Sequence, residues 1–116
     1  MNPEIKKLWV EALKSGKYKQ GARKLKKEIR KNSQWETKHC CLGVLCEILE
    51  PLGFKIINPN EEYNERIFEH KEEPNYPAKE ICNKAEISKN QAKELAGMND
   101  CDLTFEQIAN YIEENL

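Results

Sequence analysis

The sequence contains no long apolar run, and this argues against a membrane-spanning helix. Its longest such run, from Cys40 to Cys46, is far shorter than the roughly 18 residues that a spanning helix needs. The first residues, Met-Asn-Pro-Glu, also lack the apolar stretch of a signal peptide. We therefore expect a cytoplasmic protein with no membrane partner. With 39% apolar residues there is enough material for one core, so residues 1–116 are expected to form a single domain.

Motifs of common catalytic and metal-dependent enzymes are missing as well. The chain has no glycine-rich phosphate loop. An odd number of cysteines, without a signal peptide, argues against a disulfide framework. On a helix Cys41 and Cys46 would point in different directions, which makes a shared zinc ion unfavourable. We predict no metal, no cofactor and no disulfide, with free and largely buried thiols at Cys40, Cys41, Cys46, Cys82 and Cys101.

Charge is abundant but unevenly distributed along the chain. The net charge is −1, yet residues 1–40 hold 12 Lys or Arg against 4 Glu, whereas residues 41–116 hold 7 against 16 Asp or Glu. Between Lys14 and Lys31, nine cations face only Glu28. Such a block is typical of a surface that attracts anions. The alternative is that folding brings the two halves together and that their charges neutralise each other.

The N-terminal segment carries clear helix signals. Asn2 is a favoured cap, Pro3 occupies the favoured first helical position, and Ser15-Gly16 ends the helix. Its apolar residues form one stripe, which indicates a helix facing the core: Ile5, Leu8, Trp9, Ala12 and Leu13.

The most hydrophobic segment, residues 39–49, is apolar on nearly all sides and predicts a central buried helix. Pro51 and Gly53 then stop it. Gly43 inside a helix costs roughly 1 kcal/mol relative to Ala. The simplest explanation for a glycine there is the close approach of another backbone.

The C-terminal third predicts two further helices. Ser88 with Gln91 forms a capping box, and Thr104 with Gln107 forms a second one. We expect the first of these helices to end near Ala96, because Gly97-Met-Asn-Asp100 should break it. One or two helical turns are expected before them, over residues 78–85.

Residues 17–39 are harder to interpret. Leu25 and Ile29 lie four residues apart, which favours a short helix over residues 22–31. The sequence Ser33-Gln-Trp-Glu36 has the form of a capping box, which either starts a helix or orders a turn.

Two β-like runs, at residues 54–57 and 65–70, suit a small hairpin. We therefore predict a predominantly helical α+β domain with a minor two- or three-stranded β element. Its core should bury Trp9, Leu13, Leu42, Leu45, Ile108 and Ile112 together.

Three clusters of residues carry a family resemblance. They are Trp9-x-x-Ala12-Leu13-x-Ser15-Gly16-x-Tyr18-x-Gln20-Gly21, then Cys40-Cys41-Leu42-Gly43-Val44-Leu45-Cys46-Glu47, then Leu95-x-x-Met98-Asn99-Asp100 followed by Thr104-Phe105-x-x-Ile108-Ala109-x-Tyr111-Ile112-Glu113. Through them the chain resembles a family of small accessory proteins encoded by bacteriophages and prophages. The resemblance implies a phage or prophage origin and a bacterial host cytoplasm, and it supplies no catalytic residues. Many phage accessory proteins of this size act against host defences, by sequestering nucleotide signals or by inhibiting proteins.

Catalysis and nucleic-acid binding remain as alternatives. A small hydrolase or transferase would hold His39 or His70 against a carboxylate or a thiol in a pocket. The segment that starts at Thr104 loosely resembles a helix of helix-turn-helix proteins, but from Asn99 onward there is no Lys or Arg to contact DNA. The basic stretch of residues 14–31 is still able to hold phosphates without reading a sequence.

Binding of an anionic small molecule of nucleotide type is the function that we expect, and inhibition of a host defence protein is its nearest alternative. After the first helix, an aromatic ring, an amide and several cations follow one another, and these groups bind a base and its phosphates. A homo-oligomer is left open. The predicted ligand-binding residues are Tyr18, Gln20, Arg23, Lys24, Lys27, Asn99 and Asp100.

Overall fold

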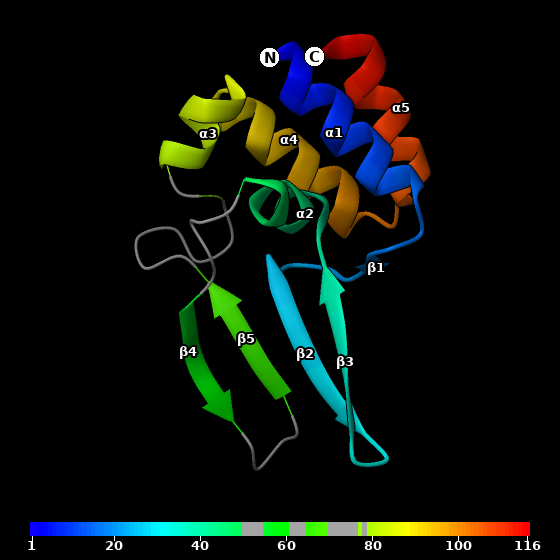
Figure 1. The fold of residues 1–116 in the computed structure, drawn as a ribbon, viewed down its shortest axis with the longest axis vertical. Helices are drawn as coiled ribbons and strands as arrows, with labels where there is room; N and C mark the ends of the chain where they lie inside the picture. The colour runs from blue at the N-terminus through cyan, green and yellow to red at the C-terminus, as the bar shows by residue number, and fades with distance from the viewer. Residues whose placement is uncertain (50–54, 61–64, 70–76, 78) are drawn as a thin grey trace.

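The fold consists of a cluster of helices and a sheet that projects from it (Figure 1). The computed structural model describes residues 1–49, 55–60, 65–69, 77 and 79–116. The helices are α1 (Pro3–Lys14), α2 (Cys41–Ile48), α3 (Lys79–Ala85), α4 (Lys89–Asp100) and α5 (Phe105–Asn115). The strands are β1 (Lys19–Gln20), β2 (Lys26–Lys31), β3 (Gln34–His39), β4 (Lys55–Asn60) and β5 (Glu65–Glu69). The predicted α+β class is therefore confirmed.

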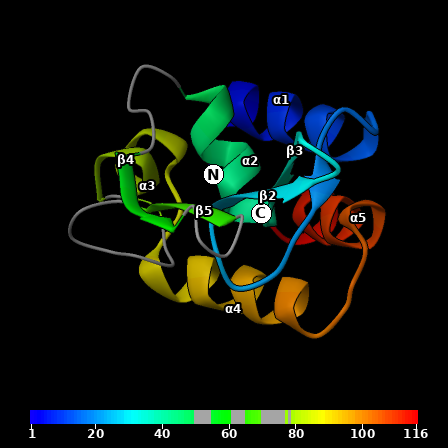
Figure 2. The ribbon, with the colours of Figure 1, turned by 90° about the horizontal axis from the view of Figure 1, so that it is seen from below.

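The sheet is larger than the sequence predicted. Its strand order is β1-β3-β2-β5-β4, with four strands of five or six residues and a two-residue β1 at one edge. β1 runs parallel to β3, and the other neighbours are antiparallel. Seen from below, β4, β5, β2 and β3 lie side by side across the middle of the molecule (Figure 2). The prediction of a minor two- or three-stranded element was wrong, although the expected β4–β5 hairpin is present.

A hairpin of β2 and β3 replaces the short helix that was predicted over residues 22–31. Asn32 and Ser33 adopt φ values of 50° and 64°, and Lys31 pairs with Gln34 across them. Two central residues with positive φ define the tight turn that matches the twist of antiparallel strands. The four-residue spacing of the apolar side chains misled the helix prediction, because only Leu25, which precedes β2, reaches the core.

The helix caps follow the sequence signals closely. Asn2 Oδ1 accepts hydrogen bonds from the backbone N–H groups of Glu4 and Ile5, at 3.0 and 3.1 Å. Both capping boxes, at the starts of α4 and α5, are formed. The predicted break at Gly97 was wrong: α4 continues to Asp100, because a single glycine weakens a helix interior without ending it.

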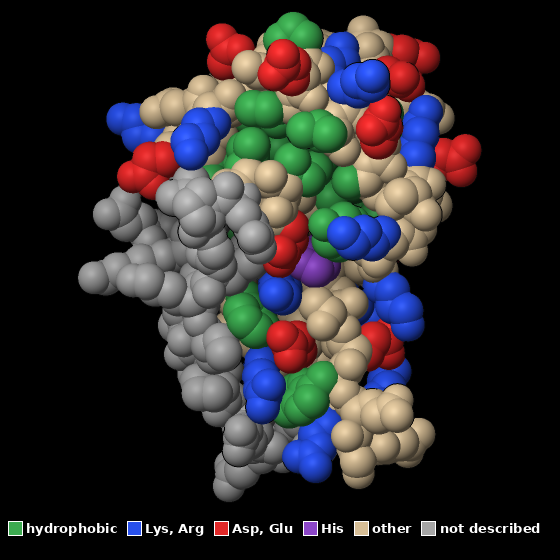
Figure 3. Space-filling view, in the orientation of Figure 1, with side chains coloured by type: hydrophobic (Ala, Val, Ile, Leu, Met, Phe, Trp, Pro, Cys, Tyr) green, Lys and Arg blue, Asp and Glu red, His purple; other side chains and the backbone are tan. Residues whose placement is uncertain are grey.

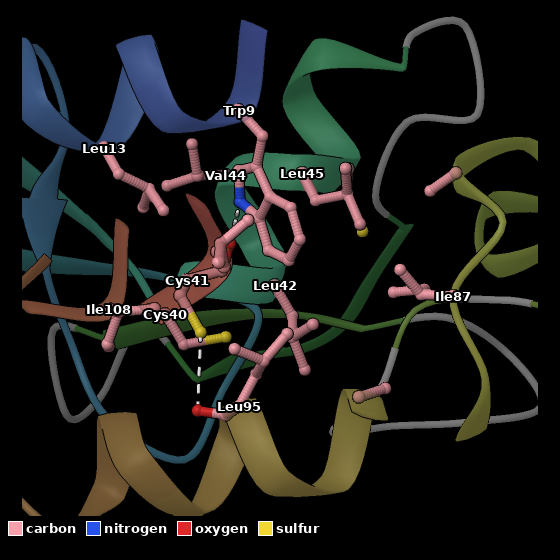
Figure 4. Close-up of a cluster of buried hydrophobic side chains, with 14 of the residues drawn as sticks. Trp9, Leu13, Cys40, Cys41, Leu42, Val44, Leu45, Ile87, Leu95 and Ile108 are labelled. Carbon is pink, nitrogen blue, oxygen red and sulfur yellow. Dashed lines mark hydrogen bonds between the residues drawn. The ribbon is translucent and has the colours of Figure 1, made fainter. Parts of the chain in front are cut away.

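The predicted core is present where the helices meet (Figure 4). α1 packs against α5 and α2, and α2 packs in turn against α4. The Trp9 indole N–H donates to the carbonyl oxygen of Cys41 at 2.9 Å, which fixes α1 to the start of α2. Leu8 was wrongly assigned to the core stripe, since 51% of it is exposed. All six predicted core residues are buried: Trp9, Leu13, Leu42, Leu45, Ile108 and Ile112.

Gly43 permits α2 to lie directly against the chain that leads into β2. A Cβ atom at this position would overlap the backbone carbonyl group of Leu25. The expectation of a close backbone approach is thus confirmed, and it explains how the sheet is attached to the helices. Among the described residues, no helix has both the length and the apolar character that crossing a membrane requires.

Candidate functional site

Gln20 was predicted to bind a ligand, but both the nitrogen and the oxygen of its side-chain amide form hydrogen bonds within the protein. Its Nε2 donates to Asn99 Oδ1 at 3.1 Å and to the carbonyl oxygen of Leu103 at 2.6 Å. Its Oε1 accepts from the backbone N–H of Phe105 at 3.1 Å. Both donor hydrogens and an acceptor site of the amide are therefore used. We assign Gln20 a structural role, holding β1 against the turn between α4 and α5.

Asn99 is also engaged within the fold. It is 2% exposed, and its Oδ1 accepts from the backbone N–H of Cys41 at 3.1 Å. Its Nδ2 donates to the carbonyl oxygen of Gly21 at 2.7 Å. A buried amide that forms hydrogen bonds to three separate segments stabilises the fold, and few of its donor and acceptor sites remain for a ligand.

The remaining predicted residues do not form one site: Arg23, Lys24 and Asp100 lie at the loop after β1, and Lys27 lies on the sheet. Arg23 adopts a positive φ of 70° in the loop after β1, where its backbone N–H donates to Asp100 Oδ1 at 2.8 Å. Lys24 follows in the same loop and is half-buried. Lys27 lies on the sheet, 3.0 Å from the Glu65 carboxylate. The structure therefore does not bring these cations together around one ligand.

Tyr18 does lie at a concave surface. A hollow of about 650 Å³ opens between the segment from Lys17 to Lys19 and the β2–β3 hairpin. This volume falls within the range of small-ligand sites. Of the seven predicted ligand-binding residues, Tyr18 alone lines it; its other lining residues include Lys17, Lys19, Lys31, Trp35 and His39.

The charges around this hollow are mainly positive. Lys19 Nζ lies 3.1 Å from the Glu36 carboxylate, and this contact lowers the pKa of Glu36, with further lowering by the charges of Lys38 and Lys31. Glu36 is the one acidic residue among those that line the hollow, against three lysines. A negatively charged ligand is therefore favoured there.

Trp35 supplies a second ring that the sequence analysis did not select. The Arg66 guanidinium lies over this ring, 4.0 Å from its centre, and is 3.8 Å from the Glu28 carboxylate. Strand alternation places Trp35, Thr37 and His39 on one face of β3. The signal was therefore available in the sequence, but residues 22–36 were interpreted as helix and turn.

An enzyme was expected to hold His39 or His70 against a carboxylate or a thiol in a pocket. His39 does contact a carboxylate beside the hollow. Its Nε2 lies 3.1 Å from Glu47 Oε1, and Lys26 Nζ lies 3.3 Å from the same oxygen. Burial lowers the pKa of His39, against the opposing effects of its hydrogen bond to Glu47 and of the Glu47 charge. Figure 3 shows this face, with the purple imidazole among acidic and basic side chains. His70, the other candidate, lies outside the described residues.

The thiols do not supply a nucleophile in this arrangement. Burial raises the pKa of Cys40 to about 11 and raises those of Cys41 and Cys46 well above their usual value. Because the thiolate is the reactive form, these three groups are inert. Cys101 is exposed and Cys82 is half-buried, so the expectation of buried thiols holds for three of the five. Within the described part of the chain, no three His, Cys, Asp or Glu side chains cluster as metal ligands would.

Fold and site together define a small α+β protein with an open, cationic and aromatic hollow beside a β-hairpin. The chain belongs to the family described as a domain of unknown function, DUF8296, whose model matches residues 1–71. This match includes every residue named above as lining the hollow. No curated protein matches the chain, and no solved structure does.

Proposed function

We propose that the protein binds a small anionic ligand of nucleotide type in the hollow beside Tyr18 and acts by sequestering it. The observation that carries this proposal is the composition of the hollow: two aromatic rings, Tyr18 and Trp35, and three lysines against one glutamate. Rings stack on nucleobases, worth about 1–3 kcal/mol per base, and ammonium groups bind phosphates. The resemblance to phage accessory proteins adds a context, in which the sequestered ligand is a nucleotide signal of host defence.

Sequestration is favoured over turnover by the state of the reactive groups. The Cys40 thiol beside His39 is buried, with its pKa raised to about 11, so it is protonated at neutral pH. His39 uses Nε2 to contact Glu47, and its remaining ring nitrogen is enclosed.

A protein partner is the second candidate, and the outer edge of β3 favours it. β1 pairs only with Lys38 and His39, and no other described strand lies on that side. The backbone N–H of Gly21 donates to the His39 carbonyl there, at 2.7 Å. Since backbone groups alternate along a strand, Trp35 and Thr37 also direct theirs outward. An extended segment of a host protein would fit this edge as an added strand.

The test is to incubate the purified protein with nucleotide extracts of phage-infected bacteria, wash it, denature it and analyse the released molecules by mass spectrometry. An intact nucleotide supports sequestration, whereas a converted product supports an enzyme. Release of nothing, with a host protein retained in a pull-down, supports the strand-addition alternative. Binding to any duplex that weakens steeply with salt would instead indicate phosphate contacts with nucleic acid.

A matched pair of variants locates the site. Lys17→Gln with Lys31→Gln removes two cations from the hollow and should weaken ligand binding at least about tenfold, because each removes a charged contact to phosphate. Arg23→Gln with Lys24→Gln removes the same charge from the neighbouring loop, which does not line the hollow. Equal losses in both variants would mean that only the overall charge matters.

A further inference from the structure

His39 is an almost fully buried polar side chain at the inner end of the hollow. It is 5% exposed, at the last position of β3. The ring of Tyr18 meets it edge-on, with 5.2 Å between the ring centres. Tyr18 is half-buried and lines the hollow. Because its ring contacts the imidazole, it separates His39 from solvent on that side.

The contact with Glu47 fixes which nitrogen of His39 carries the proton. A carboxylate accepts hydrogen bonds and does not donate them, so Nε2 must be the donor to Glu47 Oε1. Lys26 Nζ, at 3.3 Å from the same oxygen, keeps the carboxylate paired with a cation. Burial lowers the pKa of His39, so the ring is neutral at physiological pH. Nδ1 is then an acceptor with an unshared electron pair.

This Nδ1 atom has no hydrogen-bond partner among the described residues, although it is fully enclosed. It is the one buried side-chain nitrogen or oxygen in the described part of the chain for which this is so. Burying an unsatisfied polar group costs about 1–3 kcal/mol, and most buried polar groups in folded proteins are satisfied. One residue that lines the hollow therefore carries an unsatisfied hydrogen-bond acceptor, which suits a donor from a ligand.

The hollow also gives such a ligand a direction. His39 lies five positions along β3 from Gln34, which in an extended strand corresponds to roughly 17 Å. The imidazole lies at one end, and Lys31 lies at the hairpin end, paired with Gln34. Because Lys31 pairs with Gln34, its side chain lies on the face of the sheet opposite His39. A ligand with a hydrogen-bonding ring at one end and a phosphate at the other would therefore follow the hollow around the outer edge of β3.

We propose that the ligand's ring displaces Tyr18 from the edge of His39 and donates an N–H to His39 Nδ1, so that His39 favours a base that carries such a donor over an analogue that lacks it. This inference rests on the proposed function, and it names the group that chooses among ligands of that class. Glu47 acts as a positioning residue, because it holds the tautomer that leaves Nδ1 free to accept.

The experiment follows the two ring nitrogens of His39 by NMR in protein labelled with ¹⁵N-histidine. AMP, GMP, CMP and UMP are each titrated into the wild-type protein, with His39→Gln assigning the signals. Without nucleotide, Nδ1 should resonate as an unprotonated nitrogen without a hydrogen bond. At saturation its signal should move upfield, as for a nitrogen that accepts one, while Nε2 stays protonated. An Nδ1 signal that is unchanged at saturation, or already hydrogen-bonded without nucleotide, overturns the inference.

Affinity measurements supply an independent readout. The nucleotide that binds most tightly is compared with its analogue lacking the N–H donor, which for AMP is purine riboside monophosphate. Wild-type protein should bind the analogue about tenfold more weakly. In His39→Gln, whose amide N–H is placed to donate to Glu47 but which offers no acceptor at Nδ1, this preference should vanish. His39→Asn, whose oxygen lies near the Nδ1 position, should retain it.

Failure of the inference is distinguishable from failure of the proposed function. If no nucleotide binds the wild-type protein, the proposed function itself is wrong. If nucleotides bind, and binding depends on Lys17 and Lys31 but discriminates equally in the wild type and His39→Gln, the hollow is the site and His39 does not select the base.

Discussion

The side-chain amides of Gln20 and Asn99, 79 residues apart in the chain, are joined by a hydrogen bond of 3.1 Å. Through their other contacts they connect β1, the start of α2, the end of α4 and the start of α5. Two residues predicted to bind a ligand thus bind each other, and they hold in place the segment that presents Tyr18 to the hollow.

Removal of the Asn99 amide should destabilise the protein strongly. Asn99→Ala leaves the Cys41 N–H, the Gly21 carbonyl and part of the Gln20 amide without partners in a buried site. Since each such group costs about 1–3 kcal/mol, we expect the free energy of unfolding to fall by about 2–4 kcal/mol in a urea titration. Asn110→Ala, an exposed position on α5, is the control and should change it by less than about 0.5 kcal/mol. Equal effects would show that the amide network carries no stability.

Two glycines inside helices should respond to alanine in opposite directions. Gly43→Ala places a Cβ atom on the Leu25 carbonyl, so α2 and β2 must separate, at a cost of about 1–3 kcal/mol or more. Gly97→Ala meets no atom within 4 Å in the interior of α4 and should stabilise the protein by about 0.5–1 kcal/mol. Thermal unfolding of the two variants measures both changes. Destabilisation by Gly97→Ala would contradict the continuous helix α4.

Truncation of a leucine should destabilise the protein much more in the core of the helical cluster than on its surface. Leu45 is fully buried in α2, so Leu45→Ala should lower the free energy of unfolding by about 2–5 kcal/mol. Leu8 is 51% exposed on α1, so Leu8→Ala should have a much smaller effect. Urea titration of both variants provides the comparison, and similar losses would mean that Leu8 is covered in solution.

The helical part of this fold could be predicted from the sequence because its signals are local. Asn2 with Pro3, Ser88 and Thr104 each start a helix through hydrogen bonds within a few residues. Gly43 was informative for the same reason: a glycine in an apolar helix indicates a close neighbour, although not which one.

The sheet and the site could not be predicted in the same way, because they depend on contacts between distant segments. Gln20 and Asn99 are polar residues next to turns, and nothing in their neighbourhoods reveals that they face each other. Trp35 and His39 reach one face only because Asn32 and Ser33 form a tight turn, which the basic composition of this stretch obscured. A period of two along β3 was the missed signal.

The five thiols should differ sharply in reactivity. Cys101 is exposed, and Cys82 is half-buried. The other three are buried, and burial raises their pKa values, to about 11 for Cys40. Iodoacetamide at pH 8 should therefore label Cys101 first, Cys82 more slowly, and Cys40, Cys41 and Cys46 only after denaturation, as peptide mass spectrometry can measure. Rapid native labelling of Cys40 would show that α2 opens readily.

Acidification should expose the effect of burying His39. Because burial lowers its pKa in the folded protein below the ordinary 6.5, the unfolded chain takes up a proton first as the pH falls. Stability is then complete above about pH 6.5 and declines below it until the folded protein also titrates. Urea titrations between about pH 7.5 and pH 5.5 should show this decline in the wild type and a smaller one in His39→Gln. Both proteins contain His70, so the difference between them reports on His39. Identical slopes in the two proteins would mean that the imidazole is solvated and that Tyr18 does not cover it.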